Sequence, residues 1–171
     1  MLMMLAVSVA ACGSSVSGQE EKKDFGKRPD WSVTLPDGKK VSAADYDKKV
    51  VIVDFWATWC PPCRKEIPGF IKLQKTYKDQ GLEIVGFSFD RDKDVHDKWI
   101  KDQGLNYLSI FSQNEQGAKI IESFQKLIGE ISGIPTTLVV DRKGNIVYKH
   151  VGYGDPEEFE KIIKPLLAEK S

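Results

Sequence analysis

Several residue types are scarce in this chain of 171 residues, and each scarcity argues against a class of function. Histidine occurs twice and cysteine three times, so the chain has no second cysteine pair. A structural zinc site needs four nitrogen or sulfur ligands, and we therefore expect neither a metal nor another cofactor. Charge of one sign is not in excess either, because 25 basic and 25 acidic residues cancel. This balance argues against a nucleic-acid-binding protein.

The length and the apolar content favour one folded domain. Hydrophobic residues make up 41% of the chain, and 171 residues are enough for one well-buried core but too few for two ordinary domains. We find no internal repeat and no low-complexity tract in the sequence. We expect a monomer.

The first eleven residues are uncharged and mostly apolar. Residues 1–11 are too short to span a bilayer as a helix but suit the apolar region of an export signal. The segment 9–13, Val-Ala-Ala-Cys-Gly, resembles the bacterial lipobox, in which small residues precede a cysteine that becomes lipidated. The sequence departs from a usual signal because no Lys or Arg follows Met1. The alternative is an apolar N-terminus in which Cys12 is incidental.

The lipobox resemblance implies a lipoprotein of the bacterial cell envelope. Cys12 would carry the lipid, and residues 12–28 would form the lipidated cysteine and a flexible polar tether. Residues 29–171 would form the folded domain, facing the periplasm or the exterior. Disulfides persist in such compartments, which suits a chain whose other two cysteines are close in sequence.

The pattern of apolar residues predicts alternating strands and helices after the tether. A hairpin is expected first, followed by a strand-helix-strand unit with a right-handed crossover, an inserted segment, and a final strand-strand-helix unit. Strands are expected at 31–35, 40–41, 50–56, 82–89, 107–111 and 146–151, a turn running straight into a strand at 133–141, and helices at 61–78, 94–103, 115–128 and from 156 onward. This order indicates an α/β domain with a mixed sheet.

Two cysteines lie where the buried strand at 50–56 gives way to the helix at 61–78. Cys60 and Cys63 are three residues apart, and such residues are neighbours on a helix, so the pair can open and close a disulfide with little backbone movement. Cys60 precedes the first helical turn, where unpaired N–H groups and the helix dipole stabilise a thiolate. We expect Cys60 to be the nucleophile and Cys63 to resolve the mixed disulfide.

Pro61 and Pro62 separate the two cysteines. They disturb the helix little, because N–H groups of the first turn have no intrahelical acceptor. They also remove two donors that would otherwise solvate the Cys60 thiolate.

Other uses of the cysteine pair are less well supported. A zinc site would need further ligands, and His96 and His150 are isolated in the sequence. Covalent haem attachment would need a histidine where Arg64 stands. An inert structural disulfide is disfavoured because so short a loop restrains the unfolded chain little.

The segment 53–63, Val-Asp-Phe-Trp-Ala-Thr-Trp-Cys-Pro-Pro-Cys, is similar to the thioredoxin signature. The segments 64–68 and 81–86 resemble the TlpA/ResA branch of envelope thiol-disulfide oxidoreductases. The resemblance extends from about residue 25 to the C-terminus. It implies a thioredoxin fold, with a central mixed β-sheet flanked by helices, an N-terminal β-hairpin and a central insertion between residue 90 and about residue 131.

The resemblance also assigns roles to two acidic residues. Asp54 matches the buried acid that shuttles a proton to the resolving cysteine in thioredoxins, and burial should by itself raise its pKa. The alternative is a structural aspartate with a partner. Glu66 lies three residues beyond Cys63, over the same helical face, and matches an acidic residue of the ResA-like site. The alternative is an exposed helix glutamate.

The docking surface for substrate is implied by the same resemblance. Ile134-Pro135 matches the loop that faces the cysteines in thioredoxins, where the proline is cis and the backbone of the preceding residue pairs with an extended substrate. Sequence alone would favour a trans bond, since about 5% of X-Pro bonds are cis. Trp59, next to Cys60, and the two prolines of the motif are expected to contact the substrate.

The leading hypothesis is a membrane-tethered enzyme that reduces disulfides in exported proteins. The resemblance suggests apocytochrome c as a substrate and a membrane thiol reductant as electron donor. The motif does not fix the direction of electron flow, because such dithiols can donate or accept electrons according to their potential.

Two other functions remain open at this point. A peroxiredoxin-like peroxidase would have a hydroxyl three residues before the reactive cysteine, where this chain has Ala57. A non-enzymatic copper-delivery or partner-binding module would need histidine or methionine ligands near the cysteines, and His150 could be brought there by folding.

Overall fold

The computed structural model describes residues 19–21 and 24–169. The predicted export signal and the predicted lipidation site, Cys12, lie outside the described residues.

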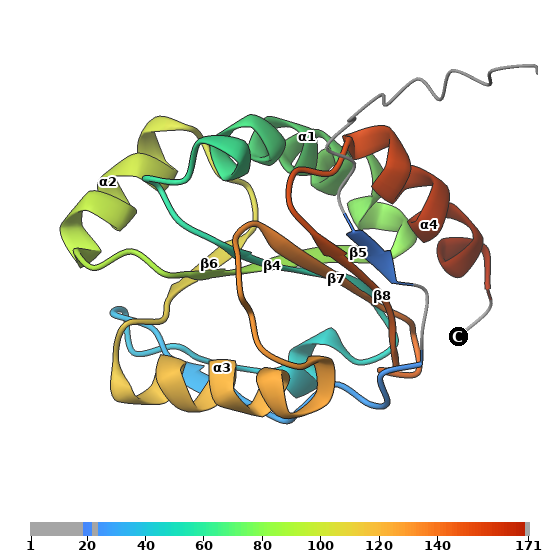
Figure 1. Ribbon diagram of the computed structural model, residues 1–171, viewed down its shortest axis with the longest axis horizontal. Helices are drawn as coiled ribbons and strands as arrows, with labels where there is room; N and C mark the ends of the chain where they lie inside the picture. Colours follow the sequence, from blue (N-terminus) through green and yellow to red (C-terminus); the bar gives the residue numbers. More distant parts are fainter. Residues whose placement is uncertain (1–18, 22–23, 170–171) are drawn as a thin grey trace, which may run out of the picture.

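A mixed sheet of six strands, in the order β1-β8-β7-β4-β5-β6, forms the centre of the domain (Figure 1). The strands β4, β5 and β6 are parallel, whereas β7 is antiparallel to β4, β8 to β7 and β1 to β8. Their bounds are Gln19–Glu21 (β1), Val50–Trp56 (β4), Leu82–Ser88 (β5), Leu108–Phe111 (β6), Thr136–Val140 (β7) and Ile146–Val151 (β8). The predicted mixed sheet is confirmed.

Helices cover both faces of this sheet (Figure 1). One face carries α1 (Pro61–Tyr77), α2 (Lys93–Asp102) and α4 (Pro156–Ala168). The other carries α3 (Glu115–Ile128) and the predicted N-terminal hairpin, which consists of β2 (Ser32–Thr34) and β3 (Lys40–Ser42) and is followed by the short helix η1 (Ala43–Tyr46). The segment expected to hold the insertion contains α2, β6 and α3.

Strand β4 is buried along its whole length and sends alternate side chains into two apolar cores. Val51 and Phe55 pack in the core with α3 and the hairpin, whereas Val50 and Ile52 pack with α1 and α4. Because side chains alternate along a strand, the Asp54 side chain points to the same side as those of Val50 and Ile52, towards the helices α1 and α4. The sequence thus places a carboxyl group in an apolar layer.

The N-terminal boundary of the domain differs from the prediction. Part of the expected tether pairs with the sheet, because β1 lies antiparallel to β8 and the Phe25 N–H donates to the Ile146 carbonyl at 3.2 Å. Arg28 N–H likewise donates to the Gly144 carbonyl at 2.8 Å. The physical reason is that β8 would otherwise leave an edge of unpaired N–H and C=O groups.

Helix α2 buries a histidine. His96 is 1% exposed, whereas the neighbouring Val95 is 51% exposed. The imidazole finds polar partners there, with Nε2 2.8 Å from Ser109 Oγ and Nδ1 2.9 Å from Asp97 Oδ1. These hydrogen bonds offset the free-energy cost of burying the polar imidazole ring.

Helix α1 ends one residue before the predicted bound. The short helix η2 (Lys78–Gln80) follows it, and Gly81 terminates the run in the left-handed region at φ 96°. A glycine adopts this conformation without steric strain, and so it can end the helical run.

Candidate redox-active site

Cys60 and Cys63 form a disulfide at the start of α1, with an S–S distance of 2.02 Å and a Cα–Cα distance of 5.3 Å. Cys60 is the N-cap of the helix, and its Sγ accepts a hydrogen bond from the Cys63 N–H at 3.3 Å. Cys63 is fully buried, and Cys60 is 3% exposed. An N–H group and a helix N-terminus therefore act on the sulfur expected to become the thiolate.

The loop before β7 lies against the Cys60 sulfur. The Ile134-Pro135 peptide bond is cis, as the resemblance implied, and the Ile134 carbonyl oxygen is 3.6 Å from Cys60 Sγ. A reduced Cys60 thiol at this distance can donate to that carbonyl. The Gly152 N–H donates to the Pro135 carbonyl at 2.8 Å, which ties the loop to the end of β8.

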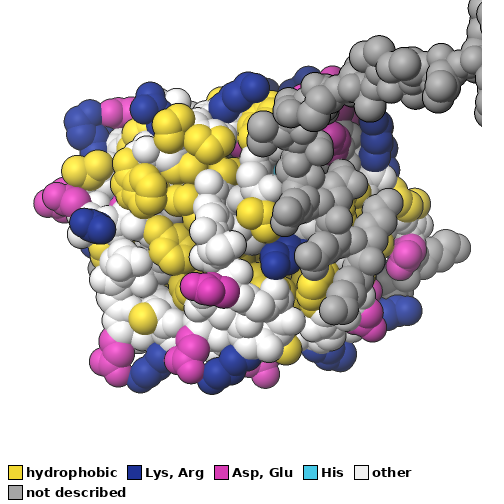
Figure 2. Space-filling model, in the orientation of Figure 1, with side chains coloured by type: hydrophobic (Ala, Val, Ile, Leu, Met, Phe, Trp, Pro, Cys, Tyr) yellow, Lys and Arg dark blue, Asp and Glu magenta, His cyan; other side chains and the backbone are white. Residues whose placement is uncertain are grey.

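Trp59 is the most exposed large apolar side chain of the described residues, with 61% of its surface open. It lies between two hollows, each of which is also lined by Arg91. One hollow, of about 440 Å³, reaches Val95, and the other, of about 320 Å³, reaches Ile134. Figure 2 shows hydrophobic side chains gathered on one face of the molecule, on the side where α2 lies.

The two prolines of the motif lie at the start of α1. Pro61 is exposed and Pro62 half-buried, and neither belongs to the linings of the two hollows beside Trp59. Substrate contact by Pro61 and Pro62 stays a prediction.

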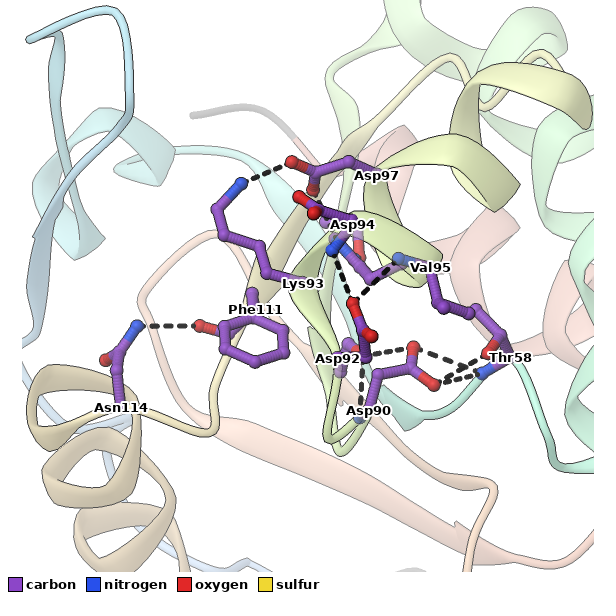
Figure 3. A network of polar contacts seen from close by, with 12 residues as sticks. Thr58, Asp90, Asp92, Lys93, Asp94, Val95, Asp97, Phe111 and Asn114 are labelled. Carbon is purple, nitrogen blue, oxygen red and sulfur yellow. Dashed lines mark hydrogen bonds and ion pairs between the residues drawn. The ribbon is translucent and has the colours of Figure 1, made fainter.

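A buried polar network holds the loop that precedes Cys60 (Figure 3). The Asp90 carboxylate accepts from the Thr58 N–H at 3.0 Å, from the Thr58 hydroxyl at 2.7 Å and from the Ser88 hydroxyl at 2.7 Å. Asp90 is 2% exposed. The sequence analysis did not select this residue, although an acid directly after a buried strand is a signal that could have identified it.

Asp54 is fully buried in the layer between the sheet and α1. Neither of its carboxylate oxygens has a hydrogen-bond partner among the residues that the structure describes. Removal from water disfavours the charged form, and this burial raises the pKa of Asp54 to about 8. The alternative of a structural aspartate with a partner is not what the structure shows.

Glu66 is also fully buried, so the alternative of an exposed helix glutamate is wrong. Its Oε1 accepts from the Gly154 N–H at 3.0 Å, whereas Oε2 is buried without a partner in the described part of the chain. Burial raises the pKa of Glu66 well above its usual range, the negative charge of Asp54 raises it further, and the Gly154 N–H opposes both effects. The structure therefore brings the two predicted acids into one electrostatic unit.

A tyrosine from the segment before β6 joins this unit. The Tyr107 hydroxyl is buried, and the pKa of Tyr107 is raised well above its usual range by burial and then by the charges of Asp54 and Glu66. No pattern in the sequence identifies this residue, because only the fold brings residue 107 beside β4 and α1.

The two histidines lie apart from each other and have different surroundings. His96 is bonded to Ser109 and Asp97, whereas His150 packs between the rings of Tyr148 and Phe159. Residues 19–21 and 24–169 contain no group of three or more side chains arranged to hold a metal ion. Within the same residues, no helix is both long and apolar enough to cross a membrane.

Comparison with known proteins gives consistent matches over the folded region. A model of the AhpC/TSA family matches residues 26–149. The thiol-disulfide oxidoreductase ResA of Bacillus thuringiensis subsp. konkukian is 30% identical over 149 residues, which cover 86% of this chain and 82% of that protein.

Solved structures show the same likeness. A thiol:disulfide interchange protein of the thioredoxin family from Chlorobium tepidum TLS superimposes with a TM-score of 0.76 at 34% identity, covering 86% of this chain and 99% of that one. The thioredoxin domain of a thiol-disulfide oxidoreductase from Bacteroides vulgatus gives a TM-score of 0.70 at 30% identity, covering 83% and 99%.

Proposed function

The chain belongs to the AhpC/TSA family of thioredoxin-fold proteins, and from this premise we propose that it is a thiol-disulfide oxidoreductase that reduces disulfides of exported proteins. The observation that carries the proposal is the Cys60–Cys63 disulfide at the start of α1, facing the cis Ile134-Pro135 loop. This arrangement combines a sulfur at a helix N-terminus, a second sulfur within bonding distance, and a backbone edge for an extended substrate.

The reaction proceeds by two thiol-disulfide exchanges. In the first, the Cys60 thiolate attacks a substrate disulfide, so that a Cys60–substrate disulfide forms and one substrate thiolate leaves. In the second, the Cys63 thiolate attacks Cys60, the bond between Cys60 and the substrate breaks, and the second substrate thiolate leaves. The substrate gains two electrons, and the enzyme is left with the disulfide that the structure shows.

The surroundings of Cys60 suit a protein substrate. Trp59 offers an exposed indole beside the nucleophile, and the hollows on its two sides can receive side chains of an extended segment. Exported apocytochrome c, whose haem-binding cysteines must be reduced, is the substrate that we propose. A membrane thiol reductant would restore the dithiol.

We further propose that the enzyme is a lipoprotein of the cell envelope, anchored through Cys12. The small residues before Cys12 support this proposal. Mass spectrometry of the mature N-terminus tests it, since a diacylglyceryl group on Cys12 is expected. A mature N-terminus with an unmodified Met1 or an unmodified Cys12 would contradict the proposed lipid anchor.

A peroxidase is the weaker alternative. Ala57 stands where that chemistry would place a hydroxyl, and the adjacent Thr58 hydroxyl already donates to Asp90 at 2.7 Å. The Thr58 O–H group therefore donates to Asp90 and not towards Cys60. The disulfide partner of Cys60 is moreover Cys63, three residues away in the same helix.

Trapping of the mixed disulfide tests the proposed function. The Cys63→Ser variant is expressed in a bacterial envelope, and proteins bound to Cys60 are identified by mass spectrometry after non-reducing separation. Exported proteins with cysteine pairs, c-type cytochrome precursors among them, are expected on Cys63→Ser and not on the matched Cys60→Ser, Cys63→Ser double variant. Full activity of Cys63→Ser without any trapped protein would contradict the proposal.

A further inference from the structure

A row of polar side chains crosses the sheet on the face that α1 and α4 cover. The strand register places Asp54 of β4 opposite Thr137 of β7, and Thr137 opposite His150 of β8. Directly opposite residues on antiparallel strands point to the same face, with Cβ atoms about 4.5–5.5 Å apart. The three side chains therefore form one line, with Thr137 in the middle.

Every member of this row is buried and has an unused polar atom. Asp54 and Thr137 are 0% exposed and His150 is 2% exposed. Both Asp54 carboxylate oxygens, Thr137 Oγ1 and His150 Nε2 lack a hydrogen-bond partner among residues 19–21 and 24–169. Buried polar atoms are almost always paired in folded proteins, so an unpaired series along one row calls for a functional explanation.

The row continues in the other direction, where its polar atoms are paired. Asp54 lies opposite Gly86 of β5, and Gly86 lies opposite Ser109 of β6. A Cβ at Gly86 would lie 2.8 Å from Trp56 Nε1, so the glycine leaves room for the indole. Trp56 Nε1 donates to Ser109 Oγ at 3.2 Å, and Ser109 Oγ is 2.8 Å from His96 Nε2. The polar atoms without a partner are therefore confined to the part of the row that runs from Asp54 through Thr137 to His150.

The groups packed around the row limit which of them can change charge near neutral pH. Glu66 faces Asp54 from α1, and Tyr107 faces both acids from the segment before β6. The Tyr148 hydroxyl is 3.5 Å from His150 Nδ1, and the apolar ring of Phe159 covers His150 from α4. Tyrosines stay neutral near pH 7. Asp54 and Glu66, whose pKa values burial raises, are therefore the two acids at this end of the row.

We propose that Thr137 and His150 form a proton path that serves Asp54, with His150 as the group that receives the proton and Thr137 as the positioning residue between them. The inference rests on the proposed disulfide exchange at Cys60 and Cys63. An acid sealed from solvent must pass on the proton that it takes from Cys63 before it can act again, and the row offers a route that does not open the apolar layer.

The proton transfers accompany the second thiol-disulfide exchange. Cys63 gives its thiol proton to the Asp54 carboxylate, and the resulting thiolate attacks Cys60, which releases the substrate thiolate. The Thr137 side chain, which bonds to neither group in the oxidised structure, rotates until its hydroxyl accepts the proton from Asp54 while it donates its own proton to His150 Nε2. Asp54 returns to the carboxylate form, and His150 becomes a cation. Reduction of the Cys60–Cys63 disulfide by the electron donor reverses these transfers.

Nuclear magnetic resonance of the two histidines tests the path in the full chain. The pH titration of each imidazole is recorded for the oxidised and the reduced protein. We expect the His150 titration to differ between the two redox states, and the difference to vanish in Asp54→Asn and in Thr137→Val. His96, on the paired half of the row, is the internal control and should titrate alike in both states. Identical His150 titrations in the two redox states of the wild type would overturn the proposal.

Rapid kinetics give a second readout, which a merely structural role of Thr137 would not move. Thr137→Val keeps the β-branched shape and removes the hydroxyl, whereas Thr137→Ser keeps the hydroxyl. We expect attack by Cys63 on a preformed mixed disulfide to slow at least about tenfold in Thr137→Val, with Thr137→Ser close to wild type. The first attack by Cys60 should be unchanged in both variants.

The two hypotheses fail in different ways. If the wild-type chain reduced no disulfide, both the proposed function and the proton path would be contradicted. If the wild type were active and Thr137→Val resolved the mixed disulfide at the wild-type rate, only the proton path would be contradicted.

Discussion

The Gly154 N–H donates to Glu66 Oε1 at 3.0 Å and so joins the residue just before α4 to the second turn of α1. A side chain at Gly154 would collide with Phe159, since a Cβ there would lie 2.5 Å from the ring. The close approach that this glycine permits lets a backbone donor reach a fully buried carboxyl group. Glu66 is therefore both a member of the acidic unit beside the cysteines and a structural link between two helices.

Substitution of Glu66 separates these two roles. Glu66→Gln keeps an oxygen acceptor for the Gly154 N–H, and we expect its free energy of unfolding at pH 7 to equal or exceed that of the wild type. Glu66→Leu leaves that N–H buried without this partner, and we expect a loss of about 1–3 kcal/mol. Urea denaturation of both variants measures the difference. Equal stability of the two variants would show that the bond to Gly154 contributes nothing.

Asp54 gives the protein a characteristic dependence of stability on pH. Its pKa is about 8 in the folded protein and about 3.8 in an unfolded chain, so the folded state binds more protons between these pH values. The stabilisation is complete below about pH 4 and is lost as the pH rises towards 8, by at most about 1.4 kcal/mol for each pH unit.

Asp54→Asn should remove this component. Urea denaturation of the oxidised protein at pH 5 and pH 8 is the measurement, and the decrease in unfolding free energy between the two should be smaller in Asp54→Asn than in the wild type. Glu130→Gln is the matched control, because it makes an acid-to-amide change at an exposed position and leaves both Asp54 and Glu66 in place. An unchanged decrease in Asp54→Asn would contradict the assignment.

The fold could be predicted from the sequence because its signals are local. The apolar run of β4, the Asp155 cap with Pro156 at the first position of α4, and the glycine that ends η2 each report on a few neighbouring residues. The cysteine pair and Asp54 belong to the same continuous segment. The edge strand β1 has no such signal, because its pairing depends on β8, about 130 residues further along the chain.

The rest of the candidate site depends on contacts between distant segments. Glu66 was ambiguous because only Gly154, 88 residues away, shows that its side chain is turned inward. Thr137 and His150 align only through the strand register, which shifts at a bulge between Val139 and Val140. Asp90 acts on Thr58 across 32 residues. None of these relations can be read from spacing in the sequence.

Asp90 should control the position of the loop before Cys60. Asp90→Ala leaves the Thr58 N–H and hydroxyl without their acceptor, and we expect a loss of about 1–3 kcal/mol in unfolding free energy. We also expect slower reduction of a protein disulfide. Asn114→Ala is the matched control, since Asn114 caps α3 through the Gly117 N–H, does not line the hollows beside Trp59, and should lose about 1 kcal/mol without the kinetic effect. Equal kinetics in the two variants would argue against a special role for Asp90.

Trp59 should matter for binding of protein substrates and little for stability. Because 61% of its surface is exposed, Trp59→Ala should change the unfolding free energy by no more than about 0.5 kcal/mol. An exposed aromatic side chain that becomes covered by a partner commonly contributes about 2 kcal/mol or more to binding. We therefore expect KM for a protein disulfide to rise at least about tenfold in Trp59→Ala, with kcat nearly unchanged, because uniform binding is lost while the cysteines remain.

Two controls make the Trp59 prediction specific. Leu127→Ala removes another exposed apolar side chain, 38% open, from α3 on the opposite face of the sheet, and it should leave KM unchanged. A small disulfide too short to reach the hollows beside Trp59 should be reduced equally well by the wild type and by Trp59→Ala. If Trp59→Ala impaired reduction of the small disulfide as strongly as that of the protein, the indole would act on the reactivity of Cys60 and not on docking. The ratio of the two KM changes therefore decides between a binding role and a chemical role for this side chain.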